Sequence, residues 1–214
     1  VQGSDQADSA NVQRLSGKRP FVGGLHLNIY NQPSLEWLAQ LGATRWVAPL
    51  EMKHEDLSAL IQNGPQNLQT EVFAYGRMAL AFSARCFTAR QRNLPKDDCQ
   101  FSCLDHPDGL MLKTRESEEF LVLNGIQTQS ARVHNLIDEL PRMQRMGVAV
   151  ARISPQAQHT GEIVALFDAV RQGSLAPRDA RAQLQPLMPE QSCNGYWHGR
   201  PGLDLVESEA LAAA

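Results

Sequence analysis

Three of the four cysteines in this 214-residue chain fall in one short segment, ARCFTARQRNLPKDDCQFSC, which spans residues 84–103. Twelve residues separate Cys86 from Cys99, and three separate Cys99 from Cys103. Residues at positions i and i+4 share a face of a helical turn, so the last two thiols are expected to point the same way. In a chain with few cysteines and no secretory signal pattern, such a group favours metal binding or redox chemistry over a disulfide framework.

Two kinds of metal centre fit this spacing. Basic side chains at positions 85, 90, 92 and 96 favour the deprotonated thiols that bind metal, although Asp97 and Asp98 oppose this effect. Structural zinc commonly uses close cysteine pairs, but Cys99 and Cys103 form the only such pair, and no histidine pair has the matching spacing. Iron–sulfur clusters accept wider spacings. An iron–sulfur cluster, a zinc ion and a metal-free group of buried cysteines therefore remain as alternatives.

The segments around the cysteines alternate between strand-like and helix-like patterns. Apolar runs predict strands over residues 21–31, 44–51, 70–76, 118–125 and 148–155. Apolar residues at helical spacing predict helices over residues 33–42, 53–64, 133–147 and 161–173, and a short helix near 177–187. The rest of the tail, 174–214, is expected to be irregular. This alternation is typical of βα units in an α/β fold with a parallel sheet.

Polar side chains on one face of the expected strands predict a β/α barrel. In LHLNIYN the leucines share one face, whereas His26 and Asn28 share the other. In a barrel the apolar residues meet the outer helices, and chemistry lies where the strands end. This rule selects His26, Glu51 and Arg152 as candidate catalytic residues. Glu51 is suited to acid–base work or substrate binding, and Arg152 is expected to need a carboxylate partner, within the chain or on a substrate.

Several motifs resemble those of a known family, in the same order. They are LHLNIYN (25–31), RWVAPLE (45–51), EVFAYGRMALAFSARCFTARQRNLPKDDCQFSC (71–103) and CNGYW (193–197). From about residue 21 to about 198 the chain resembles the U32 peptidase-like family, and within it the UbiV branch of oxygen-independent ubiquinone biosynthesis. The resemblance implies a barrel of the TIM type and a [4Fe–4S] cluster. It also implies anaerobic hydroxylation of the aromatic ring of ubiquinone precursors by a heterodimer with a UbiU-like U32 protein. A lipid-carrier accessory protein of the UbiT type is a further expected partner.

The resemblance also carries cluster ligands onto this sequence. Cys86, Cys99 and Cys103 match three of them, and the family branch takes the fourth from an N-terminal segment. The chain lacks an initiating Met, so we expect a single U32-type domain, residues 1–214, that is the C-terminal part of a barrel. Cys193 is the alternative fourth ligand, whereas the aromatic residues Tyr196 and Trp197 beside it are expected to pack in the tail.

Composition narrows the possible functions. The formal net charge of −3 gives no general attraction to nucleic acid, and no apolar run reaches the roughly 18 residues of a membrane span, so a cytoplasmic location is expected. No Ser/His/Asp, Cys/His or zinc-protease arrangement supports true peptidase activity. Two alternatives to ring hydroxylation remain: a U32-type factor that hydroxylates an RNA base, and a non-catalytic scaffold whose cluster staples the fold or relays electrons.

Overall fold

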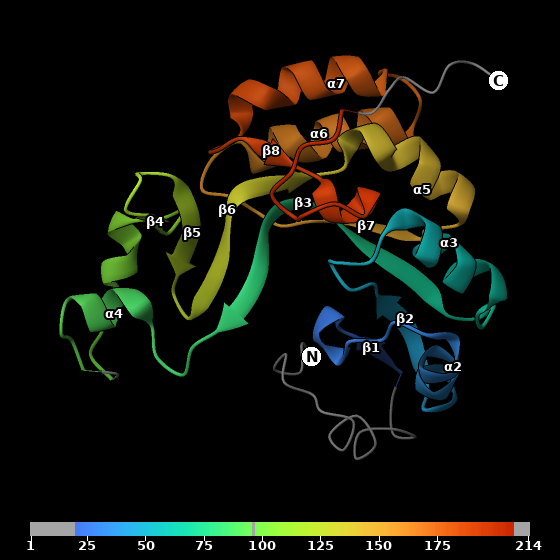
Figure 1. Cartoon of the computed structure of the whole chain (residues 1–214), viewed down its shortest axis with the longest axis horizontal. Helices are drawn as coiled ribbons and strands as arrows, with labels where there is room; N and C mark the ends of the chain where they lie inside the picture. The colour runs from blue at the N-terminus through green and yellow to red at the C-terminus, as the bar shows by residue number, and fades with distance from the viewer. Residues whose placement is uncertain (1–19, 96, 208–214) are drawn as a thin grey trace. The chain divides into compact units, whose positions relative to one another are not determined.

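The computed structural model describes residues 20–95 and 97–207, and these residues fold into two compact units (Figure 1). The first unit contains residues 20–74, 138–153 and 194–207, and the second contains residues 75–137 and 154–193. One long strand, β3 (Gln69–Phe82), runs from the first unit into the second. Each unit is therefore assembled from segments that lie far apart in the sequence.

The first unit is built on parallel strands and the helices between them. Its elements are β1 (Phe21–Gly23), η1 (Leu25–Leu27), α2 (Gln32–Gln40), β2 (Ala43–Val47), α3 (His54–Asn63), the start of β3, α5 (Leu140–Met146), β7 (Val150–Ile153) and η5 (Gly195–His198). The short helix η3 (Ile137–Glu139) precedes α5. Strands β1, β2 and β3 pair in parallel, and β7 pairs with β3. This is the succession of strands and helices that the sequence predicts.

Local signals explain where α2 begins and ends and which residues form the core. The Asn31 side chain accepts a hydrogen bond from the Ser34 N–H at 3.0 Å, which caps the start of α2. Gly42, with a φ of 97°, follows its end in a conformation that is costly for other residues. The largest buried side chains of the first unit include Leu38, Trp46 and Leu57, so α2, β2 and α3 each contribute to its core.

The second unit is built on antiparallel strands and two helices. Its elements are the end of β3, α4 (Phe87–Gln91), η2 (Ser102–Asp105), β4 (Leu110–Lys113), β5 (Glu119–Asn124), β6 (Gln127–Asn135), α6 (Thr160–Arg171), α7 (Pro177–Leu184), η4 (Gln185–Leu187) and β8 (Ser192–Cys193). Strand β6 pairs antiparallel with β3 and β5, and β5 with β4, whereas β8 pairs with β6 in parallel. The fully buried Tyr75 of β3 packs edge-on against Phe167 of α6, with ring centroids 5.8 Å apart.

The strands follow the order β1-β2-β3-β6-β5-β4, with β7 on β3 and β8 on β6, and the sheet is not closed across the described residues. The predicted α/β class is confirmed. The expected β-then-α alternation is wrong between residues 83 and 135, where β5 and β6 are joined by a two-residue turn. Gly125 supplies the left-handed backbone of that turn, with a φ of 59°.

Two predicted segments have different boundaries in the structure. Only residues 21–23 of the strand expected over 21–31 are extended; the chain then forms η1 and turns at Asn28, whose φ is 53°. The helix expected over 133–147 begins at Leu140, because residues 133–135 complete β6. Pro141 lies in the first turn of α5, where its missing N–H removes no intrahelical hydrogen bond, so the helix continues through it although a proline inside the predicted helix 133–147 would be expected to interrupt it.

Candidate functional site

The segment with three cysteines, residues 86–103, forms a folded loop in the second unit, and we call it the cysteine loop. Cys86 lies just before α4, Cys99 lies in the irregular segment between α4 and η2, and Cys103 belongs to η2. The elements α4 and η2 contact each other. An ion pair of 2.6 Å between Arg92 Nη2 and Asp105 Oδ2 joins the end of α4 to η2. The loop therefore folds back on itself and brings its two ends into one region.

The thiols of the cysteine loop are available as ligands but are not gathered around one point. Cys86, Cys99 and Cys103 are all free and partly exposed. Among the described residues, no three His, Cys, Asp or Glu side chains lie where they could hold one metal ion. Between the last two cysteines, Gln100 and Phe101 have φ values of 51° and 48°, a left-handed conformation that residues with a Cβ rarely adopt. The donor set suits a thiolate-bound centre, and holding one would require the loop to rearrange.

The fourth cysteine has a different environment. Cys193 lies in β8 opposite His134 of β6 and is fully buried. Burial raises the pKa of its thiol to about 12, because a thiolate loses the hydration that stabilises its charge. The neutral thiol is therefore the stable form of Cys193. Whether this residue completes a ligand set stays a prediction.

The carboxyl groups of Glu119 and Glu190 lie near Arg77 and form a second polar cluster in the second unit. Arg77 Nη1 donates hydrogen bonds to the carbonyl oxygens of Ser130, at 3.0 Å, and of Ala131. Burial raises the pKa of Glu190, and the hydrogen bond that it shares with Glu119 raises it further. Glu190 can thus hold a proton at a higher pH than a carboxyl group in water. Neither glutamate is recognisable as a site residue from the sequence, since no spacing motif links residues 71 positions apart.

Glu51 has a tyrosine as its partner in the first unit. It follows β2 and is exposed, and its Oε2 accepts a hydrogen bond of 3.1 Å from the Tyr30 hydroxyl. Burial, with the negative charge of Glu51 as a second cause, raises the pKa of Tyr30 to about 12. Tyr30 is therefore a hydrogen-bond donor that can orient the carboxylate of Glu51. His26 lies in η1, half-buried, at the end of β1.

Arg152 has the carboxylate partner that the sequence analysis expects, and the partner belongs to the chain. Its Nε bonds to Oε1 of Glu71, a residue 81 positions earlier on β3. Arg45 of β2 contacts the other oxygen of the same carboxylate, with 3.4 Å between Nη1 and Oε2. Glu51 and Arg152 thus have separate partners, and the described contacts do not join them into one catalytic group.

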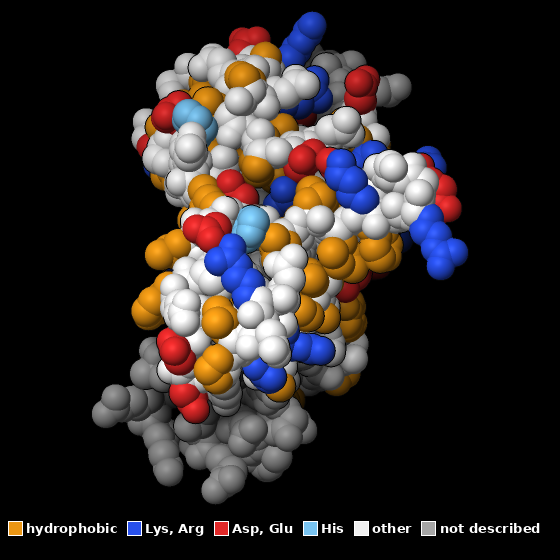
Figure 2. Space-filling model, turned by 90° about the vertical axis from the view of Figure 1, so that its left-hand side faces the viewer, with side chains coloured by type: hydrophobic (Ala, Val, Ile, Leu, Met, Phe, Trp, Pro, Cys, Tyr) orange, Lys and Arg blue, Asp and Glu red, His pale blue; other side chains and the backbone are white. Residues whose placement is uncertain are grey.

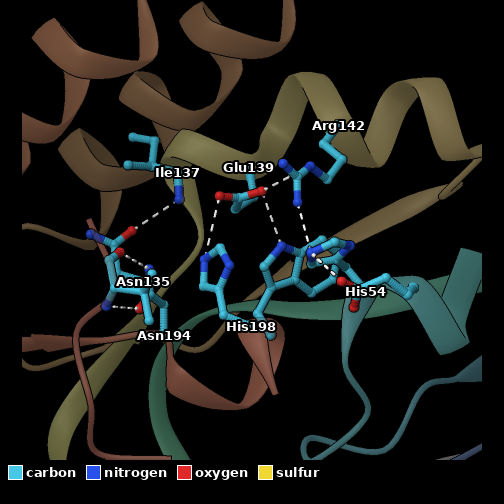
Figure 3. A network of polar contacts seen from close by, with 10 residues as sticks. His54, Asn135, Ile137, Glu139, Arg142, Asn194 and His198 are labelled. Atoms are coloured by element: carbon cyan, nitrogen blue, oxygen red, sulfur yellow. Dashed lines mark hydrogen bonds and ion pairs between the residues drawn. The ribbon is translucent and has the colours of Figure 1, made fainter. Parts of the chain in front are cut away.

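A buried polar network in the first unit was not predicted (Figure 3). Its centre is Glu139, whose Oε2 accepts a hydrogen bond of 3.0 Å from Trp197 Nε1 and lies 3.4 Å from Arg142 Nε. Arg142 also donates to the ring of His54 at 2.8 Å, and His198 Nε2 lies 3.6 Å from Glu139 Oε1. Burial, ahead of the charge of Arg142, lowers the pKa of His54.

This network holds the C-terminal segment in place. Trp197 is 3% exposed, which confirms that it packs rather than covers an open site. Asn194 closes the same segment on itself, since its side chain accepts from the Val206 N–H at 2.7 Å and donates to the Val206 carbonyl at 2.8 Å. Polar contacts around a buried carboxylate of this kind rigidify the structure that surrounds them.

Comparisons with known proteins identify a family. The family model described as peptidase family U32 matches residues 12–206, which is most of the chain. No solved structure matches the chain.

Across the described residues, no helix combines the length and the apolar character needed to pass through a bilayer.

Proposed function

The chain belongs to peptidase family U32, and on this premise we propose that it is the iron–sulfur subunit of an oxygen-independent hydroxylase. Its substrate is the aromatic ring of ubiquinone precursors, and its partner is a UbiU-like U32 protein. A protein of the UbiT type would deliver the lipid precursor. The resemblance to the UbiV branch, carried by SARCFTAR and the cysteine spacing that follows it, is the support for this finer assignment.

One observation carries the proposal: three reduced, partly exposed thiols occupy one folded loop. Cys86, Cys99 and Cys103 would supply three thiolates, and Cys193 or a residue outside the described segments would supply the fourth. A [4Fe–4S] cluster, when bound, supplies one-electron chemistry. The Arg92–Asp105 ion pair keeps the end of α4 next to η2, and the loop would have to rearrange to bring the three thiolates to one cluster. Zinc is the alternative occupant.

The proposal extends to the architecture and to the acid–base residues. The parallel strands β1, β2, β3 and β7 with their intervening helices are what one side of a β/α barrel contains. Glu51, oriented by Tyr30, follows the carboxyl end of β2, where such folds place their chemistry. In this role Glu51 would accept or return a proton on the substrate, with His26 as a second group at the end of β1.

The test is an anaerobic assay of ring hydroxylation with the purified chain and its UbiU-like partner. Product should form only with both proteins, and Cys86→Ser should abolish it. Glu51→Gln should lower the rate by about a hundredfold if Glu51 is the acid–base residue. Full activity of the Cys86→Ser protein would contradict the cluster role.

A scaffold role is the second candidate, because the described contacts give Glu51 and Arg152 separate partners. The same assay distinguishes a catalytic subunit from a scaffold. If the chain is a scaffold, Cys86→Ser should abolish activity, whereas Glu51→Gln and His26→Ala should leave it unchanged. Charge gives no support to an RNA substrate, since the net charge is −3 and acidic and basic side chains are interspersed on the face shown in Figure 2.

A further inference from the structure

One contact sets the charge state of the polar network that holds the C-terminal segment, residues 194–207. Arg142 Nη1 lies 2.8 Å from Nε2 of His54, the first residue of α3 (Figure 3). A guanidinium has no acceptor, so it must donate here, and Nε2 of His54 must accept and carry no proton. Arg142 also contacts Glu139, which receives the Trp197 N–H from η5. The folded network therefore contains an uncharged His54.

A proton on His54 would replace this hydrogen bond by a repulsion between two cations. The charged and titratable side chains around the ring come from α3, from η3 and α5, and from η5: Glu55, Glu139, Arg142 and His198. The carboxylate of Glu55 lies 3.4 Å from His54 Nε2, but its side chain is 60% exposed, so water screens its charge. Glu139 already contacts Trp197 and Arg142. Burial, followed by the charge of Arg142, accordingly lowers the pKa of His54.

The second histidine of the network responds differently to a proton. His198 Nε2 lies 3.6 Å from Glu139 Oε1, so a proton on this ring gains an attraction that offsets part of the cost of charging a buried group. The His54 ring instead lies against a guanidinium. Of the two rings, His54 is therefore the one whose protonation destabilises the network.

The C-terminal segment that the network holds is closed on itself. Within it, the Asp204 N–H donates to the Pro201 carbonyl at 2.9 Å. The Asn194 side chain exchanges two hydrogen bonds with the backbone of Val206. These contacts do not depend on the rest of the unit, whereas the indole of Trp197 bonds to a side chain beside α5. The segment can therefore leave as one piece without the unfolding of α3 or α5.

We propose that His54 is a pH-sensitive latch: a proton on its ring releases residues 194–207 from the first unit while α3 and α5 stay folded. The release changes the surroundings of the Tyr30–Glu51 pair, because Tyr196 belongs to the segment and lies close enough to Tyr30 to interact with it electrostatically. Acidification thus removes an aromatic neighbour of this pair. The latch uses none of the cysteines and does not depend on the function proposed above.

The substitution His54→Gln distinguishes a latch from a passive structural contact. Glutamine keeps an oxygen that can accept from Arg142, and it takes up no proton in this pH range. We expect hydrogen exchange of residues 194–207 to be equal in the two proteins at pH 7.5. At pH 5.5 it should be up to about tenfold faster in the wild type, because a released imidazole with an ordinary pKa of 6.5 is protonated about ten times as often as it is neutral. Arg142→Gln removes the opposing cation and should also abolish the response, which keeps the latch testable if His54→Gln fails to fold.

The experiment is hydrogen–deuterium exchange of the full chain, followed by mass spectrometry, with variants compared at the same pH so that intrinsic exchange rates cancel. His159→Gln is the matched control: His159 also pairs with a glutamate, at 3.0 Å, but its side chain is 41% exposed, so this variant should respond to acid as the wild type does. Faster exchange at pH 5.5 that is confined to residues 194–207 and absent in His54→Gln supports the latch. Equal rates in the wild type and His54→Gln, loss of the response in His159→Gln, or the same acceleration in peptides of α6 would overturn it.

Discussion

Replacing Glu139 by alanine tests the buried network of the first unit. The Glu139 side chain is 4% exposed and receives the Trp197 N–H at 3.0 Å. The substitution leaves that N–H buried without its acceptor and takes the carboxylate away from Arg142, whose side chain is 28% exposed. In the folded protein the Trp197 N–H and the Arg142 guanidinium are partly or wholly removed from water and contact the Glu139 carboxylate instead. Without that carboxylate, neither group can recover its full hydration.

The cost follows from these contacts. A buried hydrogen bond to a charged group contributes about 1.5–3 kcal/mol, and loss of one partner of a buried ion pair costs about 3–5 kcal/mol. Because Arg142 keeps some access to water, we expect Glu139→Ala to lower the free energy of unfolding by about 3 kcal/mol. Glu139→Gln retains an acceptor for Trp197 and should lose about 1–2 kcal/mol. These losses are large against a net stability of about 5–15 kcal/mol.

The assay is denaturant unfolding followed by tryptophan fluorescence and by circular dichroism. Glu162→Ala is the control: Glu162 also pairs with a histidine, at 3.0 Å, but its side chain is 62% exposed. That variant should change stability by less than about 0.5 kcal/mol. If Glu139→Ala loses no more stability than Glu162→Ala, the reasoning from burial and partner number is refuted.

Three further predictions concern pH, backbone space and the cysteine loop. Burial lowers the pKa of His54 and of His198 below the ordinary value of 6.5. The unfolded chain therefore binds more protons than the folded one, so the contribution of these histidines to stability is fully present above about pH 6.5 and is lost as the pH falls below it. Unfolding midpoints that stay constant from pH 7.5 to about 5.5 would contradict this. Gly195→Ala should prevent the C-terminal segment from docking, because a Cβ there would collide with the Pro201 carbonyl, and limited proteolysis should detect the released segment. Arg92→Ala removes the ion pair with Asp105 and should weaken metal binding to the cysteine loop by about tenfold, measured by competition with a chelator. Arg171→Ala, which removes the exposed ion pair with Asp168, is the control. Equal metal affinity in the two variants would show that the Arg92–Asp105 ion pair does not support metal binding.

Periodicity in the sequence was enough to predict three of the helices, two in the first unit and one in the second. Helices α2, α3 and α6 carry apolar residues at helical spacing and lie within two residues of their predicted bounds. Strand β6 was missed because QTQSARVHN alternates polar residues with few apolar ones, and its pairing with β3 and β5 rather than its composition makes it a strand. Tertiary pairing of this kind leaves little trace in a single sequence.

In the candidate sites, too, single residues were recognisable from the sequence, whereas their partners were not. Cysteine spacing drew attention to the loop, but the positions of its thiols depend on how the loop folds back, which includes a left-handed backbone at Gln100 and Phe101. Arg152 was recognisable as a charge within a strand, whereas its partner Glu71 lies 81 positions away and is identified only by strand register. Glu139 lies in a segment predicted to be helical, and no nearby residue marks it as buried. Its hydrogen-bond partner Trp197 lies 58 positions later.

The proposal that the cysteine loop binds an iron–sulfur cluster is tested most directly by anaerobic purification of the full chain. Iron and acid-labile sulfide would be counted per chain, with optical and paramagnetic resonance spectra recorded on the same sample. We expect about four iron and four sulfide per chain with the spectrum of a cubane, and loss of both in Cys99→Ser. A colourless protein that carries one zinc ion, or iron retained in full by Cys99→Ser, would contradict it.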